Sequence, residues 1–92
     1  MEDVVQELVS VRATAAGVPT LVCWRGLDYR VVGRPVRWVD RAFWWTWPAD
    51  QDPQIVEQPM WSVSLAEPGG GILQADLSVS PDDWWRLERV RG

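Results

Sequence analysis

Apolar and polar residues alternate along two stretches in the second half of the chain. Trp61, Val63 and Leu65 alternate with two serines, and the segment 73–79 alternates in the same way. A period of two is typical of strands that bury one face and expose the other. We therefore predict two strands here, joined by a glycine-rich hairpin loop at 67–71.

The first half contains a second strand pattern. The β-rich runs 20–24 and 29–32 are separated by 25–28, which contains Gly26 and suits a hairpin. Pro35 is expected to end the second of these strands. The segments 36–41 and 43–47 then predict two further strands.

The two ends of the chain are ambiguous. The apolar residues between Val5 and Arg12 fit neither period well, so a strand and a short helix remain open, and we favour a strand. Ser80, with the proline and aspartate after it, fits a helix start as well as a turn before a strand. We favour the strand, in which Trp85 and Leu87 would share a face.

These elements predict one small, mainly β domain over residues 1–92. Six or seven short strands at near-regular spacing are typical of a curved antiparallel sheet or a small open barrel, comparable in size to SH3 and OB domains. The segment 48–59 contains three prolines and several acids, and is expected to form an extended, solvated loop. Its acidic groups would favour a basic surface on a partner.

Tryptophan dominates the composition, with eight residues in a chain of 92. Each can bury on the order of 200 Å², which helps so short a chain to build a core. Alternation assigns Trp24, Trp38, Trp61 and Trp85 to that core. Two pairs of tryptophans, 44/45 and 84/85, are adjacent in the sequence. Neighbouring residues of a strand point to opposite faces, so the two members of a pair cannot both face the core. One member of each pair must therefore cover a barrel end or form an exposed patch.

Catalytic chemistry has little support in this sequence. There is no histidine, and Cys23 is the only cysteine, in an apolar run where we expect it to be buried. The carboxylate pairs 50/52 and 82/83 flank prolines, where aspartate is common in turns. We expect no enzyme activity, no cofactor and no metal site.

Charge is distributed unevenly along the chain. The net charge is −4, yet six of the nine arginines lie between residues 12 and 41, opposed there only by Asp28 and Asp40. A basic face is one explanation, and a GC-rich coding bias toward arginine is the other. Without a long apolar run or a basic leader, we expect a cytoplasmic protein that does not enter a membrane.

The order of the aromatic segments resembles a known family. The segments are 24–31 (WRGLDYRV), Trp38, Trp44-Trp45, 61–63 (WSV) and 85–90 (WRLERV). Together they resemble a small Trp-rich actinobacterial family of unknown function, over roughly Pro19 to Val90. Its members are often encoded beside a Y-family DNA polymerase-like protein in a damage-induced mutagenesis cassette. The resemblance implies an accessory in DNA damage tolerance that binds this polymerase-like protein, and it supplies no catalytic residues.

Two functions are therefore expected from the sequence. The first is a non-catalytic protein-interaction module, with tryptophans and arginines as contact residues because these residue types dominate interface hot spots. The candidates are Trp44, Trp45, Trp47, Trp84, Arg37 and Arg41. The alternative is a single-stranded nucleic-acid-binding domain that uses an arginine and tryptophan face, drawn from Arg25, Arg30, Arg34, Arg37 and Arg41. The oligomeric state stays open.

Overall fold

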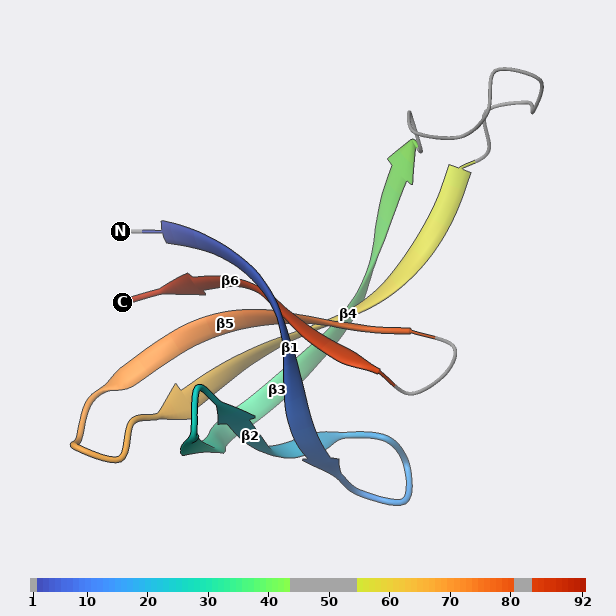
Figure 1. The fold of residues 1–92 in the computed structure, drawn as a ribbon. Coiled ribbons are helices and arrows are strands. Elements are labelled where there is room, and N and C mark those ends of the chain that lie inside the picture. The colour runs from blue at the N-terminus through green and yellow to red at the C-terminus, as the bar shows by residue number, and fades with distance from the viewer. Residues whose placement is uncertain (1, 44–54, 81–83) are drawn as a thin grey trace.

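The chain folds into a six-stranded antiparallel barrel. The computed structural model describes residues 2–43, 55–80 and 84–92. The strands are β1 (Glu2–Ala13), β2 (Pro19–Trp24), β3 (Leu27–Phe43), β4 (Ile55–Ala66), β5 (Ile72–Val79) and β6 (Trp85–Arg91). Each pairs with the next along the chain, and β6 pairs with β1 to close the barrel (Figure 1). The sequence prediction of a small, mainly β domain is confirmed.

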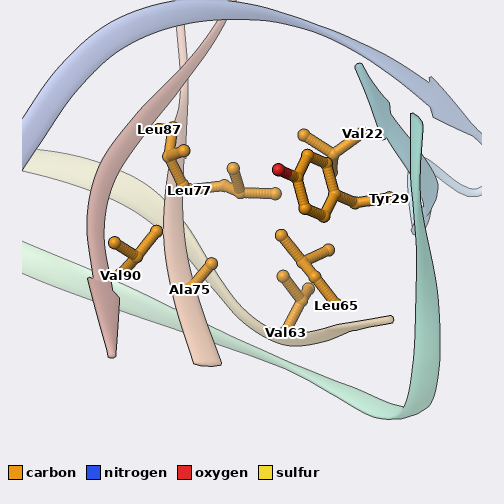
Figure 2. Close-up of a cluster of buried hydrophobic side chains, with 8 residues drawn as sticks. All are labelled: Val22, Tyr29, Val63, Leu65, Ala75, Leu77, Leu87 and Val90. Atoms are coloured by element: carbon orange, nitrogen blue, oxygen red, sulfur yellow. The ribbon is translucent and has the colours of Figure 1, made fainter. Parts of the chain in front are cut away.

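The barrel interior holds one compact core. Its side chains come from β2 to β6 and converge on a single cluster (Figure 2). The members are Val22, Tyr29, Val63, Leu65, Ala75, Leu77, Leu87 and Val90. Burying one such leucine stabilises the fold by about 1.5–3 kcal/mol. Trp24, Trp61 and Trp85 pack around this cluster half-buried, in agreement with their predicted core assignment.

The first hairpin turns more tightly than the sequence indicated. Trp24 pairs with Leu27, so only Arg25 and Gly26 form the turn. Both have positive φ, 52° and 78°. Positive φ at both central residues is the type I′ geometry, whose twist matches that of the flanking strands.

β3 does not end at Pro35 as expected. Val32 pairs with Ser64 and Val36 with Ser62, so residues 33–35 stand opposite Val63 alone. This bulge admits Pro35, because a bulge leaves backbone groups outside the ladder. The strand then continues, and residues 36–43 pair with residues 55–62 of β4. We call this paired ribbon the arm, and it projects away from the barrel (Figure 1).

The predicted loop 48–59 is wrong over its last five residues, because 55–59 belong to β4. Pro59 pairs with Val39 of β3, while the pairing of β4 with β5 begins only at Met60. At Pro59 one side of β4 is therefore an edge, where a residue without an N–H is tolerated. Residues 48–54, and the predicted strand 43–47 beyond Phe43, lie outside the described part of the chain.

Both ambiguous ends are strands. Across β1 and β6, Val4 pairs with Arg89 and Glu7 with Leu87, so the ladder is irregular between these pairs. The ladder between β5 and β6 shifts at the same place. This shift is why Leu87 and Val90, three residues apart, both reach the core. Trp85 and Leu87 share the inner face, as predicted.

Candidate functional site

Trp84 is the most exposed tryptophan that the structure describes. It precedes β6, and 61% of its surface is accessible. Its backbone is fixed: the Ser80 N–H donates to the Trp84 carbonyl at 2.8 Å, and the Trp84 N–H donates to Ser80 Oγ at 3.0 Å. These two hydrogen bonds tie Ser80, after the end of β5, to Trp84, directly before β6. The result is a large apolar side chain exposed to water on a backbone that two hydrogen bonds hold to Ser80.

Leu8 of β1 accompanies Trp84 on this surface. Leu8 is 63% exposed. It pairs with Arg86, two residues after Trp84, on the outer face of the barrel. Two clefts, of about 680 and 410 Å³, are both lined by Leu8 and Trp84. We call these two residues and their clefts the Trp84–Leu8 surface.

A third cleft, of about 350 Å³, continues this surface toward the arm. It shares Gln58 and Arg86 with the smaller Trp84–Leu8 cleft. Met60, which is almost fully buried, also lines it, although Met60 pairs with Ser78 on the outer face. Val4 of β1, a further exposed apolar residue, also lines this third cleft. The outer face therefore carries a nearly continuous hollow with both apolar and polar walls.

A polar network crosses four strands on the outer face. Trp38 Nε1–H donates to Ser62 Oγ at 2.9 Å, and the Ser62 hydroxyl donates to Asp76 Oδ1 at 2.8 Å. Asp76 is buried, and its Oδ2 lies 3.6 Å from both Arg89 Nε and a terminal guanidinium nitrogen of Arg91. Trp38, which alternation assigned to the core, thus lies on the opposite face of the sheet. It connects the arm to β5 and β6.

Arg25 at the first turn is held by the neighbouring strand. Its guanidinium donates to both carboxylate oxygens of Glu7, at 3.1 Å from Nε to Oε1, and its Cζ lies 4.7 Å from the centre of the Trp24 ring. The hydrogen bond from Arg25 holds the pKa of Glu7 below its ordinary value, with a smaller contribution from Trp24 Nε1. Arg25 is thereby committed to a contact within the chain.

Cys23 is half-buried on the outer face, where it pairs with Ser10 and Asp28, instead of being buried as expected. Alternation explains the difference, because Val22 and Trp24 take the inner positions on either side. Desolvation, together with the neighbouring Asp28, raises the pKa of the thiol. A raised pKa lowers the thiolate fraction and opposes nucleophilic chemistry at this residue.

The structure gathers the candidate contact residues only in part. Trp44, Trp45 and Trp47 lie outside the described residues. Arg37 is exposed on the arm, on the face of its pair Trp61, and lines none of the clefts around Trp84. Arg41 pairs with Glu57 farther along the arm, and only its backbone is described. Sequence reasoning named Trp84 as a contact candidate and did not name Leu8 or Met60, which line the clefts around it.

The arginines proposed for nucleic acid are dispersed as well. Arg25 bonds to Glu7, and Arg30 pairs with Leu21 and Ala66 on the outer face of the barrel. Arg34 lies within the bulge of β3, where the regular alternation of faces is interrupted. Arg30 and Arg34 therefore do not share a face by simple alternation, although the sequence had indicated that they would. No single basic face unites them in the described part of the chain.

Among residues 2–43, 55–80 and 84–92, no group of three or more histidine, cysteine, aspartate or glutamate side chains is placed to hold a metal ion. The same residues contain no helix long and apolar enough to cross a membrane. The carboxylate pairs 50/52 and 82/83 lie outside the described residues. Comparison of the chain with known protein families, with curated proteins and with solved structures found no match.

Proposed function

We propose that this chain is a non-catalytic protein-interaction module that binds its partner through the Trp84–Leu8 surface. The observation that carries the proposal is the exposure of Trp84 on a backbone fixed by Ser80, next to the exposed Leu8. Exposed apolar residues beside a hollow are typical of protein interfaces. The hydrogen bonds to Ser80 hold the Trp84 backbone in place before binding, which reduces the backbone ordering that binding must pay for.

The surroundings of Trp84 support a protein partner. Arg86 lines the same cleft, and its Nε lies 2.6 Å from Glu88 Oε1, which also accepts from the Ser78 hydroxyl at 2.7 Å. A polar rim of this kind around an apolar centre is the usual anatomy of an interface.

The resemblance described above indicates where to look first for the partner. It leads us to propose an accessory role in DNA damage tolerance in the cytoplasm, with the Y-family polymerase-like protein of the mutagenesis cassette as the first candidate. Its binding can be measured directly with the two purified proteins. That the chain is an interaction module and that this protein is its partner are two separate proposals, and they are tested separately.

The test compares alanine variants in a binding titration. Trp84→Ala and Leu8→Ala should each weaken partner binding, Trp84→Ala by about thirtyfold, which corresponds to a hot spot of about 2 kcal/mol. Ile72→Ala is the matched control, because Ile72 is 56% exposed and apolar but lies at the β4–β5 hairpin and lines none of the clefts. All three variants should melt within a few degrees of the parent chain.

The proposal fails if Trp84→Ala and Ile72→Ala bind a confirmed partner equally well. If the polymerase-like protein does not bind the parent chain, the proposed partner is wrong. The surface is then tested with partners identified by cross-linking, and the same two variants decide.

Single-stranded nucleic acid remains the alternative function, and one observation favours it: Trp84 and the half-exposed Arg86 line one cleft. A base could stack on the indole while the guanidinium meets a phosphate. The pairing of Arg86 with Glu88 weakens that role. Binding of an oligonucleotide that falls steeply with salt and is lost in Trp84→Ala would favour this function, and no binding at low salt would remove it.

A further inference from the structure

One edge of the arm has no neighbouring strand. β2 pairs with β3 from Trp24–Leu27 to Leu21–Arg30 and no farther. Beyond Arg30, β3 pairs only with β4 in the described structure. After the bulge, the ladder with β4 is regular from Val36 to Phe43. This segment therefore presents a regular strand edge, whose backbone groups can pair with another chain.

The other edge of the arm is blocked at Gln58 and Pro59 of β4. Pro59 of β4 has no N–H to offer, and its carbonyl accepts from Gln58 Nε2 at 3.2 Å. The same Gln58 amide donates to the Val79 carbonyl at 2.7 Å, so it covers the end of β5. Proline and side-chain cover are two of the ways in which natural sheets block an edge. β3 has no such block from Val36 to Phe43.

Pro59 also indicates which amides of β3 face the open edge. Pro59 lies opposite Val39 in the ladder. Residues opposite each other in an antiparallel ladder form hydrogen-bonded and non-hydrogen-bonded pairs in turn, and a proline, which has no N–H, fits a non-hydrogen-bonded pair. The bond from Gln58 to the Pro59 carbonyl, directed away from β3, agrees with this. The N–H and carbonyl groups of Val39 then point to the open edge, as do those of Arg37, two residues earlier. Trp38 and Asp40 point toward β4.

We propose that the β3 edge, residues 36–43, binds an extended segment of another protein by strand addition. The inference goes beyond the Trp84–Leu8 surface, because it concerns a different part of the molecule. The added strand would form main-chain hydrogen bonds to Arg37 and Val39, and its side chains would alternate between the two faces of the arm.

The side chains beside this edge define the occupant. Val36, 57% exposed, and Trp38 share one face of the arm, and Arg37 lies on the other. Arg37 makes no ion pair within the described part of the chain. An added strand with apolar residues on the first face and acidic residues on the second complements both.

A second copy of β3 complements this edge poorly. Two antiparallel copies related by a two-fold axis would place Arg37 against Arg37 in one register. In the next register Val36 would face Asp40. Like charges directly opposite each other destabilise a sheet. The occupant that we propose is a different chain, with apolar residues facing Val36 and Trp38 and acidic residues facing Arg37, and a second copy of β3 is an outcome that the first test below detects.

The free protein gives the first test. Amide hydrogen exchange followed by NMR on the full chain should show fast exchange at Arg37 and Val39 and slow exchange at Trp38 and Asp40. If all four exchange slowly, and the protection grows with protein concentration, a second copy covers the edge and the proposal is overturned.

The second test adds a defined probe, an eight-residue acetylated and amidated peptide in which valine alternates with glutamate. The peptide should slow exchange at Arg37 and Val39, and a peptide with lysine in place of glutamate should bind more weakly. Val39→Pro removes the amide from the edge, and should weaken binding by about tenfold, the scale of one good hydrogen bond. Val39→Ala, which keeps the N–H, is its matched control.

Further controls separate the edge from the fold. If Val39→Pro destabilises the arm, exchange at Trp38 will report it. N-methylation of alternate peptide amides then replaces the variant: methylation of one alternate set should abolish binding, and methylation of the other should leave it. Trp84→Ala should bind the peptide normally. Absence of added protection at Arg37 and Val39 at the highest soluble peptide concentration overturns the proposal.

Discussion

The buried carboxylate of Asp76 should be a major stabilising group on the outer face. Asp76→Ala removes the acceptor of the 2.8 Å hydrogen bond from Ser62 and two ion-pair contacts at 3.6 Å, to Arg89 and Arg91. A hydrogen bond to a charged group contributes about 1.5–3 kcal/mol. The side chains of Arg89 and Arg91 are 39% and 53% exposed and lie 3.6 Å from the carboxylate, so their contacts add less than about 1 kcal/mol. We therefore expect Asp76→Ala to lower the free energy of unfolding by about 2–3 kcal/mol.

Urea denaturation followed by tryptophan fluorescence measures this loss, and the melting temperature should fall by about 8–20 °C in a chain of this size. Asp76→Asn keeps an oxygen that can accept from Ser62, so it should cost less than half as much. Combined with Ser62→Ala, Asp76→Ala should show a coupling of about 1 kcal/mol or more. A loss below about 0.5 kcal/mol for Asp76→Ala, or no coupling to Ser62, would refute the network as a source of stability.

Three further outcomes follow from local geometry. The fold lowers the pKa of Glu7, so its contact with Arg25 stabilises the protein at a pH above the ordinary pKa of 4.5 and is lost as the pH falls below that value. Glu7→Gln should therefore reduce the loss of stability below pH 4.5, measured by urea denaturation at several pH values. Gly71→Ala should cost about 1–2 kcal/mol, because Gly71 has φ +93°, which residues with a Cβ rarely adopt; the Glu67 carboxylate oxygen that would lie 2.8 Å from the new Cβ can rotate away. Gly69→Ala, with open space and no positive φ, should melt almost unchanged. Cys23 should react with iodoacetamide more slowly than a free thiol at pH 8, since its pKa is raised.

Alternation in the sequence predicted the barrel strands correctly where each strand buries one face. Val63, Leu65 and Leu77 occupy inner positions that their period of two had assigned. The same pattern could not reveal how far each strand extends. Pro35 marks a strand end in the sequence, but in the fold it marks a bulge within β3, because tertiary pairing with β4 resumes beyond it.

The outer face was the less predictable part. Leu8 lies in a stretch with no clear period, and Asp76 reads as an ordinary exposed residue of an alternating strand. Its burial depends on Ser62, Arg89 and Arg91 of the two neighbouring strands β4 and β6, and the pattern within β5 alone does not reveal which residues of those strands lie beside it. Trp38 was misassigned for a related reason: its indole N–H is satisfied by Ser62 on the outer face, so the ring does not need the core.

Site-specific cross-linking tests the central proposal, an interaction surface at Trp84 and Leu8, most directly. A photoreactive amino acid is placed at position 84 in one version of the full chain and at position 72 in another, and each is irradiated in cells in which the chain is normally made. We expect position 84 to form a defined adduct with one protein, and Leu8→Ala to reduce that adduct. Adducts of equal yield and identity from both positions would contradict the account, as would an adduct from position 72 alone.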